Sequence, residues 1–123
     1  MTPTNASEVN LVDTNEARFN EDVFAAPEAV VLVVFWLPGY DLSRAILRFS
    51  HQTAAIFGRR IRVVRVEARK NSRLMTRYSV GKLPAFLIVT DHQIQYQIST
   101  LDPLVLQAQL REALNTVSLP LSS

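Results

Sequence analysis

The chain has 123 residues, of which 48% are hydrophobic and 20% are charged, a balance typical of one soluble globular domain. It contains no cysteine, which excludes disulfide bonds, thiolate metal ligands and thiol–disulfide exchange. The net charge of +2 is unevenly spread: residues 1–43 carry −6, residues 44–82 carry +10, and the remainder carries −2.

The first third of the chain predicts two strands with a helix between them. Residues 9–12 favour a short strand, and Asp13-x-x-Glu16 resembles a capping box that would open a helix through about Phe24. Phe19 and Val23 lie one helical turn apart and indicate the inner face of that helix. The nearly continuous aliphatic run Val30–Phe35 is typical of a central strand covered on both sides.

A long amphipathic helix is expected next, from an N-cap at Asp41 to about Phe57, with Gly58 at its C-terminus. Its apolar and small residues recur at helical spacing and predict the buried side. These positions are Leu42, Ala45, Ile46, Phe49, Thr53 and Ile56.

The second half predicts a strand, a short helix, a hairpin and a final helix. The expected ranges are Ile61–Val66 for the strand, Asn71–Tyr78 for the short helix, Ala85–Val89 and Ile94–Ile98 for the hairpin, and Asp102–Val117 for the last helix, with Leu106, Leu110 and Leu114 along one stripe. The arginines that alternate with valines in the Ile61–Val66 strand must pair with acids or reach solvent past the sheet edge. The order of elements predicts an α/β fold with a mixed sheet.

No apolar run approaches the length of about 18 residues needed to cross a bilayer, and the N-terminus lacks the basic start and apolar stretch of a secretion signal. We therefore expect a cytoplasmic protein with one domain at residues 8–117, a flexible N-terminus at 1–7 and a flexible tail at 118–123. His51 and His92 have no partners at metal-ligand spacing, so no metal site is expected.

Two segments carry a resemblance to a known family. VLVVFW at Val31–Trp36 and RYSVGKLPAFLIV at Arg77–Val89, with the distance from Tyr40 to Pro84, resemble the thioredoxin family in their order and spacing. The resemblance covers roughly residues 8–117. It implies a three-layer sandwich, a mixed central sheet of about five strands with helices on both faces, and a cis Leu83–Pro84 peptide bond.

The family's Cys-x-x-Cys motif is replaced here. The four positions read Tyr40, Asp41, Leu42 and Ser43. The resemblance also places Val34 where thioredoxins keep a buried acid that assists proton movement. Gly39 stands at the family's second tryptophan, and Arg48 at its helix proline. Because the thiols and the acid are missing together, the family's fold is expected without its activity or any cofactor.

A non-thiol enzyme is not expected either. Ser43 would need a nearby base to act as a nucleophile, and His51 lies about two helical turns away. Ser43 is therefore interpreted as structural. Tyr40 has two open interpretations, as an aromatic contact for a partner or as a side chain that fills volume.

The remaining function is binding, for which the sequence offers two surfaces. The first is a groove for a protein partner, at the carboxyl ends of the parallel strands where open α/β sheets bind ligands. Its expected residues are Trp36, Leu37, Pro38, Tyr40, Leu83 and Pro84. Buried support for the fold is an alternative role for Trp36, the single tryptophan.

The second surface is the arginine-rich middle of the chain, which would suit nucleic acid, another polyanion or an acidic protein. Its candidate residues are Arg44, Arg48, Arg69, Lys70, Arg73 and Arg77. No known nucleic-acid-binding motif accompanies them, and a solvated basic face is a further interpretation. The sequence therefore favours an adaptor, assembly factor or chaperone-like module, with polyanion binding as the alternative.

Overall fold

The computed structural model describes residues 10–39, 41–99 and 102–118. Its centre is a five-stranded sheet in the order β1-β3-β2-β4-β5. The strands are β1 (Leu11–Thr14), β2 (Val30–Trp36), β3 (Ile61–Glu67), β4 (Ala85–Thr90) and β5 (Gln93–Ile98). β1, β3 and β2 are parallel, whereas β4 and β5 form an antiparallel hairpin beside β2. The mixed five-stranded sheet expected from the sequence is confirmed.

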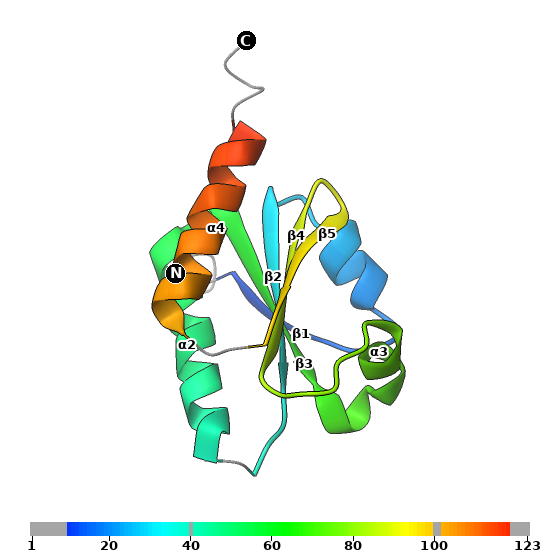
Figure 1. Cartoon of the computed structure of the whole chain (residues 1–123). Helices are drawn as coiled ribbons and strands as arrows, with labels where there is room; N and C mark the ends of the chain where they lie inside the picture. The colour runs from blue at the N-terminus through cyan, green and yellow to red at the C-terminus, as the bar shows by residue number, and fades with distance from the viewer. Residues whose placement is uncertain (1–9, 40, 100–101, 119–123) are drawn as a thin grey trace, which may run out of the picture.

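Helices cover both faces of this sheet and make the three layers visible in Figure 1. One face carries α2 (Asp41–Phe57) and α4 (Pro103–Ser118). The other carries the π-helical turn η1 (Asn20–Phe24) and the short helix α3 (Ser72–Arg77). Two single 3-10 turns, η2 (Gly58–Arg60) and η3 (Ala68–Lys70), flank β3.

The core has two halves, one on each side of the sheet, because successive strand side chains point to opposite faces. The first core cluster lies under α2 and α4 and includes Leu32, Val34 and Leu110. The second core cluster lies under η1 and α3 and includes Phe19 and Leu74. β2 is buried along Val30–Phe35, which explains its unbroken aliphatic sequence.

The prediction of a helix that begins at a capping box on Asp13 is wrong. Asp13 lies within β1, and its carboxylate bonds Arg65 of β3 instead of a helix N-terminus. The next turn is closed by Asn15, whose Oδ1 accepts a hydrogen bond from the backbone N–H of Arg18 at 3.0 Å. The side-chain oxygen needed to start the turn was therefore predicted two residues too early.

The predicted buried side of α2 is wrong at one position. Ile46, Phe49 and Thr53 are buried, but Ile56 is 49% exposed and Phe57 takes the core place beside them. Gly58 has φ +59°, the left-handed conformation that ends a helix easily at glycine.

The ends of the fold lie partly outside the described residues. The expected flexible N-terminus belongs to the residues not described, and so does the expected C-terminal tail except for Ser118, the last residue of α4. Over the described ranges, no helix is long and apolar enough to span a bilayer.

Candidate functional site

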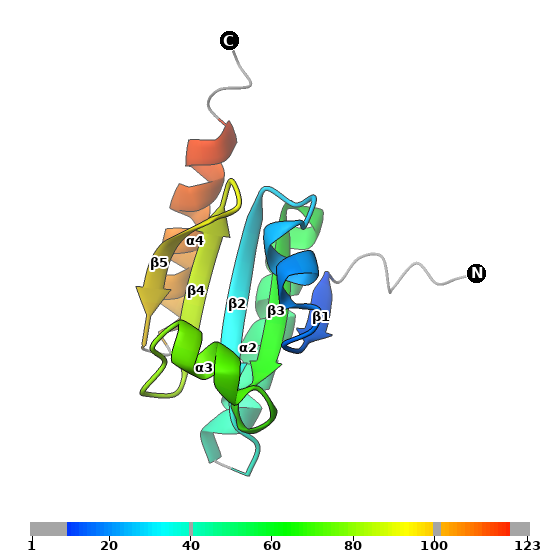
Figure 2. The same cartoon turned by 90° about the vertical axis from the view of Figure 1, so that its right-hand side faces the viewer.

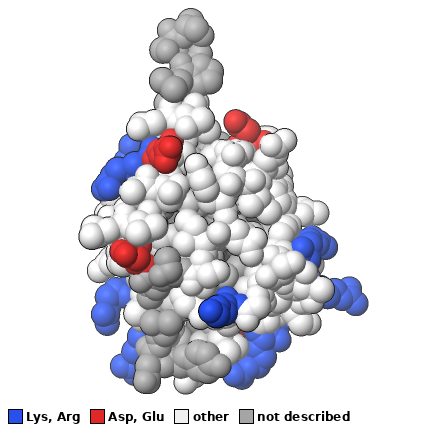
Figure 3. Space-filling view, in the orientation of Figure 1, with Lys and Arg blue, Asp and Glu red and all other residues white. Residues whose placement is uncertain are grey.

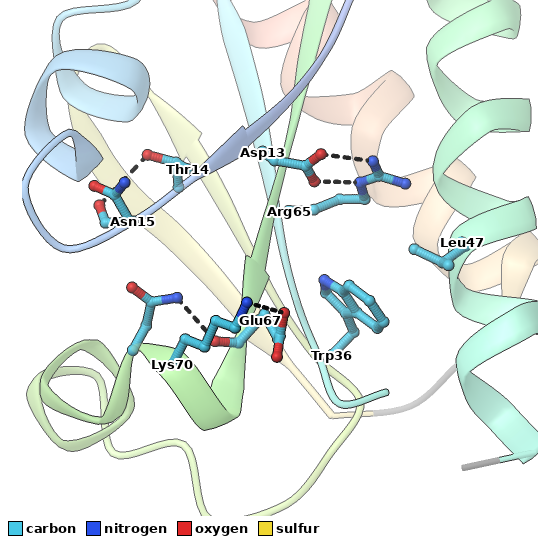
Figure 4. Close-up of a pocket in the computed structure, with 9 residues that line it drawn as sticks. Asp13, Thr14, Asn15, Trp36, Leu47, Arg65, Glu67 and Lys70 are labelled. Carbon is cyan, nitrogen blue, oxygen red and sulfur yellow. Dashed lines mark hydrogen bonds and ion pairs between the residues drawn. The ribbon is translucent and has the colours of Figure 1, made fainter. Parts of the chain in front are cut away.

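A pocket opens at the carboxyl end of the parallel strands, and we call it the end pocket. Its volume is about 500 Å³. Residues from β1 and the loop after it, from the ends of β2 and β3, from α2 and from η3 surround it (Figure 4). They are Asp13, Thr14, Asn15, Trp36, Leu47, Arg65, Glu67, Lys70 and Asn71.

One wall of the end pocket is an ion pair between neighbouring strands. Asp13 pairs with Arg65 in the β1–β3 ladder, and the guanidinium donates from Nε to Oδ1 at 2.8 Å and from Nη2 to Oδ2 at 2.9 Å. The Arg65 side chain is only 17% exposed, whereas that of Asp13 is 67% exposed. The two-point contact fixes the guanidinium plane and leaves the carboxylate open to the pocket.

Toward the ends of the strands, beyond Asp13 and Arg65, lie a second charged pair, Glu67 and Lys70, and the indole of Trp36. Glu67 is the register partner of Trp36, and Lys70 Nζ lies 3.9 Å from Glu67 Oε1. Trp36 is half-buried and packs against the first core cluster, while Leu47 of α2 lines the pocket on its far side (Figure 4). The end pocket therefore combines an aromatic wall with charges of both signs.

Asn71 fastens the loops around the pocket. Its Oδ1 accepts from the backbone N–H of Glu16 at 3.1 Å, and its Nδ2 donates to the carbonyl of Glu67 at 2.8 Å. Glu16 in turn accepts from the backbone N–H of Arg73 at 2.9 Å. The loop after β1, the end of β3 and the start of α3 are thus tied together by a buried amide.

The structure only partly gathers the residues predicted for the partner groove. Phe35 and Ala85 form the last pair of the β2–β4 ladder, so Trp36 and Pro84 follow side by side at its end. Trp36 packs on the first core cluster and Leu83 on the second, which places the set on both sides of the sheet.

The other predicted groove residues show different degrees of burial. Leu37 and Pro38 are half-buried, and Pro84 is buried after a cis Leu83–Pro84 peptide bond. Tyr40 lies outside the described residues.

The former motif positions are described only in part. Ser43 is buried, with 9% of its surface exposed. The side chains of Asp41 and Leu42 lie outside the described part.

The arginine-rich set does not lie on one face. Arg44 and Arg48 project from α2, and Arg73 and Arg77 belong to α3 on the opposite side of the sheet. Their side chains are exposed, and none forms an ion pair with a described acid. In Figure 3 the basic side chains gather mainly around the lower half of the molecule, where the parallel strands end.

Two arginines of β3 pair with acids, one of the two outcomes expected from the sequence. Arg65 pairs with Asp13, and Arg62 Nε lies 3.0 Å from Glu28 Oε1. Asp13 is missed as a partner because its local pattern also fits a helix cap; the alternation of arginine with buried valines is the available signal. Among the described residues, no group of three or more acids and histidines gathers as a metal site would require.

The fold and the site define a thioredoxin-type domain whose chain lacks the thiols of that chemistry. The profile of the thioredoxin family matches residues 10–115, so the chain belongs to this family.

Two solved structures show the same fold. A chain in the crystal structure of ferredoxin:thioredoxin reductase with thioredoxin f2 superposes with a TM-score of 0.76 at 15% identity, covering 87% of this chain and 97% of that one. A mutant thioredoxin from Halobacterium salinarum NRC-1 gives a TM-score of 0.74 at 14% identity, covering 85% and 90%. The comparison with curated proteins gave no match. The absence of cysteine argues against thiol–disulfide oxidoreductase activity in this member, because it has no thiolate to react.

Proposed function

We propose that this protein is a redox-inactive binding module that holds a segment of a protein partner at the carboxyl end of its sheet. The observation that carries the proposal is the end pocket, about 500 Å³ in volume, at the sheet end where α/β folds bind ligands. The chain has no thiol to act there, and binding is what the remaining chemistry supports.

The lining of the pocket suits a peptide better than an apolar ligand. Trp36 and Leu47 offer an apolar wall, and half-buried tryptophans are frequent anchors in protein interfaces. Asp13, Glu67 and Lys70 supply an acceptor or donor for charged side chains and backbone groups. A mixed-charge pocket favours a partner segment that itself carries both kinds of polar group.

The groove predicted from the sequence extends this site past Trp36 toward Pro84. Trp36 lies between Glu67, at the end of β3, and Pro84, which precedes β4. One extended segment of a partner could therefore contact both the end pocket and the groove. In this proposal Leu37, Pro38 and Leu83 contribute apolar surface, and Tyr40 is a further contact. A module of this kind would serve as an adaptor, an assembly factor or a chaperone-like protein.

Polyanion binding is the second candidate, and exposure of the unpaired arginines favours it. Of the six candidate residues, Lys70 pairs with Glu67, and the other five form no ion pair with a described acid: Arg44, Arg48, Arg69, Arg73 and Arg77. Arg44 and Arg48 lie in α2, and Arg73 and Arg77 lie in α3 on the opposite side of the sheet. Basic side chains gather mainly around the lower half of the molecule in Figure 3. Such binding would weaken steeply as salt is raised.

One substitution separates the two candidate functions because it should weaken binding in the end pocket without weakening the binding of a polyanion. Glu67→Gln keeps the shape of the pocket but removes a carboxylate, which raises the net positive charge. A partner held in the pocket should bind about two- to tenfold more weakly to this variant, whereas a polyanion should bind at least as tightly. Glu112→Gln, exposed on α4, is the matched control.

The measurement is affinity capture from the source cell with each variant, followed by titration of the captured partner against Trp36 fluorescence. A partner weakened by Glu67→Gln and not by Glu112→Gln supports the end pocket. A partner that nuclease releases, or one that binds both variants alike without changing Trp36 emission, contradicts it.

A further inference from the structure

The free edge of the sheet is formed by β5. In the strand order this strand has β4 on one side and no described strand on the other, and Figure 2 shows it at the outer margin of the sheet. From Gln93 to Ser99 the sequence QIQYQIS contains no charged residue and no proline. Unpaired backbone groups along such an edge can accept another strand.

The edge lacks the usual protection over most of its length. Native edge strands are commonly guarded by lysine, proline, inward-pointing charge or a bulge. Here the ladder with β4 shifts register between Ile88 and Val89 and leaves out Gln95, so an irregularity marks the first half of β5. Beyond it Tyr96, Gln97 and Ile98 pair regularly with Ile88, Leu87 and Phe86.

From Gln95 to Ser99 the side chains alternate in a way that complements a copy of the same segment: Gln95, Gln97 and Ser99 are polar, and Tyr96 and Ile98 are apolar. Ile94, before the irregularity, pairs with Val89 and therefore lies on the other face of the sheet. In an antiparallel pair whose two-fold axis passes through one residue, polar positions meet polar positions and apolar positions meet apolar ones. Without charges on the strand, two copies meet there without repulsion between like charges.

We infer that β5 pairs antiparallel with β5 of a second copy of this chain, joining two sheets across a two-fold axis at Gln97. This register uses the regular part of the strand. It places Gln97 opposite its own copy and Tyr96 opposite Ile98, an aromatic side chain against a β-branched one. The inference concerns a different edge from the end pocket and does not depend on the proposed function.

Exposed apolar side chains beside β5 extend the surface. Tyr96 and Ile98 pair with Ile88 and Phe86, which face the first core cluster and therefore α4. The first turn of α4 exposes Leu104 by 78% and Val105 by 42%. In the two-fold pair the joined strands bring both copies of this turn to the same face, where they add apolar contact to the backbone ladder.

The pairing leaves the end pockets accessible. The pocket is lined from β1, β3 and the end of β2, whereas β5 is the opposite margin of the sheet. A dimer formed through β5 would therefore present two binding sites to one partner or to two.

The experiment measures molar mass by sedimentation and uses a single introduced thiol as a positional probe, because the chain has no cysteine of its own. Wild type should sediment with twice the mass of one chain at high concentration. Gln95→Lys should reduce it to the monomer mass, since each copy then brings a charge to the joint, while Gln52→Lys on exposed α2 should remain dimeric.

On mild oxidation Gln97→Cys should form a covalent dimer, because the two-fold register places the two thiols directly opposite each other, with Cβ atoms about 4.5–5.5 Å apart before a small adjustment closes the bond. Gln52→Cys should not. Wild type that remains a monomer, a dimer indifferent to Gln95→Lys, or equal cross-linking of the two cysteine variants would each overturn the inference. Circular dichroism of Gln95→Lys distinguishes loss of pairing from loss of folding.

Discussion

Asp13 and Arg65 stand opposite each other in β1 and β3 and share two hydrogen bonds, of 2.8 and 2.9 Å. Arg65 is also the register partner of Val34 in β2. The resemblance to thioredoxins places an acid at Val34, in the centre of the sheet. In this chain the centre is apolar and the carboxylate lies two strands away in the edge strand, where it is largely open to solvent.

We expect the Asp13–Arg65 pair to stabilise the fold by about 1 kcal/mol, more than an ordinary surface ion pair. The reason is that the guanidinium donates two hydrogen bonds to the carboxylate and is itself mostly buried. The measurement is a double-mutant cycle of Asp13→Asn and Arg65→Met by urea unfolding.

The Glu67–Lys70 pair serves as the control for that cycle. Its atoms lie 3.9 Å apart and Lys70 is 77% exposed, so Glu67→Gln and Lys70→Met should couple by less than about 0.5 kcal/mol. Equal coupling in both cycles would show that the geometry of the Asp13–Arg65 contact adds nothing.

Restoring an acid at Val34 should make stability depend on pH. Val34 is completely buried, so the pKa of the new carboxyl in Val34→Asp should rise above its ordinary value of about 3.9. Below that value both folded and unfolded chains hold the proton. As pH rises above it, the unfolded chain loses the proton first, and stability should fall by up to about 1.4 kcal/mol per pH unit.

The comparison for this prediction is Val34→Asn, which is polar but does not titrate. The difference in unfolding free energy between the two variants should widen from pH 4 to pH 7. A difference that stays constant would mean that Arg65 turns from Asp13 to the new carboxylate and keeps it ionised.

The sequence predicted those parts of the fold whose signal is local. The aliphatic run of β2 and the leucine stripe of α4 each identify an element and its buried side without reference to neighbours. The N-terminal region failed because Asp13-x-x-Glu16 satisfies a helix cap locally, while the competing partner Arg65 lies 52 residues away. A preference that depends on distant pairing is not visible in the local pattern.

The same reason limits prediction of the site. Trp36 was identified because it follows a recognisable strand, and it does line the end pocket. Asn71 and Glu67 were not identified, since their roles come from the loop after β1 folding onto the end of β3. The arginine set looked continuous in sequence, but the crossover from α2 to α3 through β3 divides it between two faces.

The packing of α4 can be tested with two leucines of the same helix. Leu110 is fully buried in the first core cluster, and Leu104 is 78% exposed. Leu110→Ala should destabilise the fold by about 2–5 kcal/mol through lost burial and a residual cavity, whereas Leu104→Ala should change stability by less than about 0.5 kcal/mol. Urea midpoints measure both. Similar losses would mean that α4 docks through a different face.

Asn71 should matter more for stability than its polar side chain suggests. It is 4% exposed and bonds two backbone groups from different segments, so Asn71→Ala leaves the partly buried Glu16 N–H and Glu67 carbonyl without this partner. We expect a loss of about 1–3 kcal/mol.

Asn71→Asp retains the acceptor for Glu16 but cannot donate to the Glu67 carbonyl, and it adds a buried charge. It should therefore also be destabilising at neutral pH and should improve as acid protonates the new carboxyl. Ser72→Ala, at the next and exposed position, is the matched control and should remain close to wild type. Urea unfolding at pH 7 and pH 5 gives all three values, and a stable Asn71→Ala would show that the loops around the end pocket hold together without this amide.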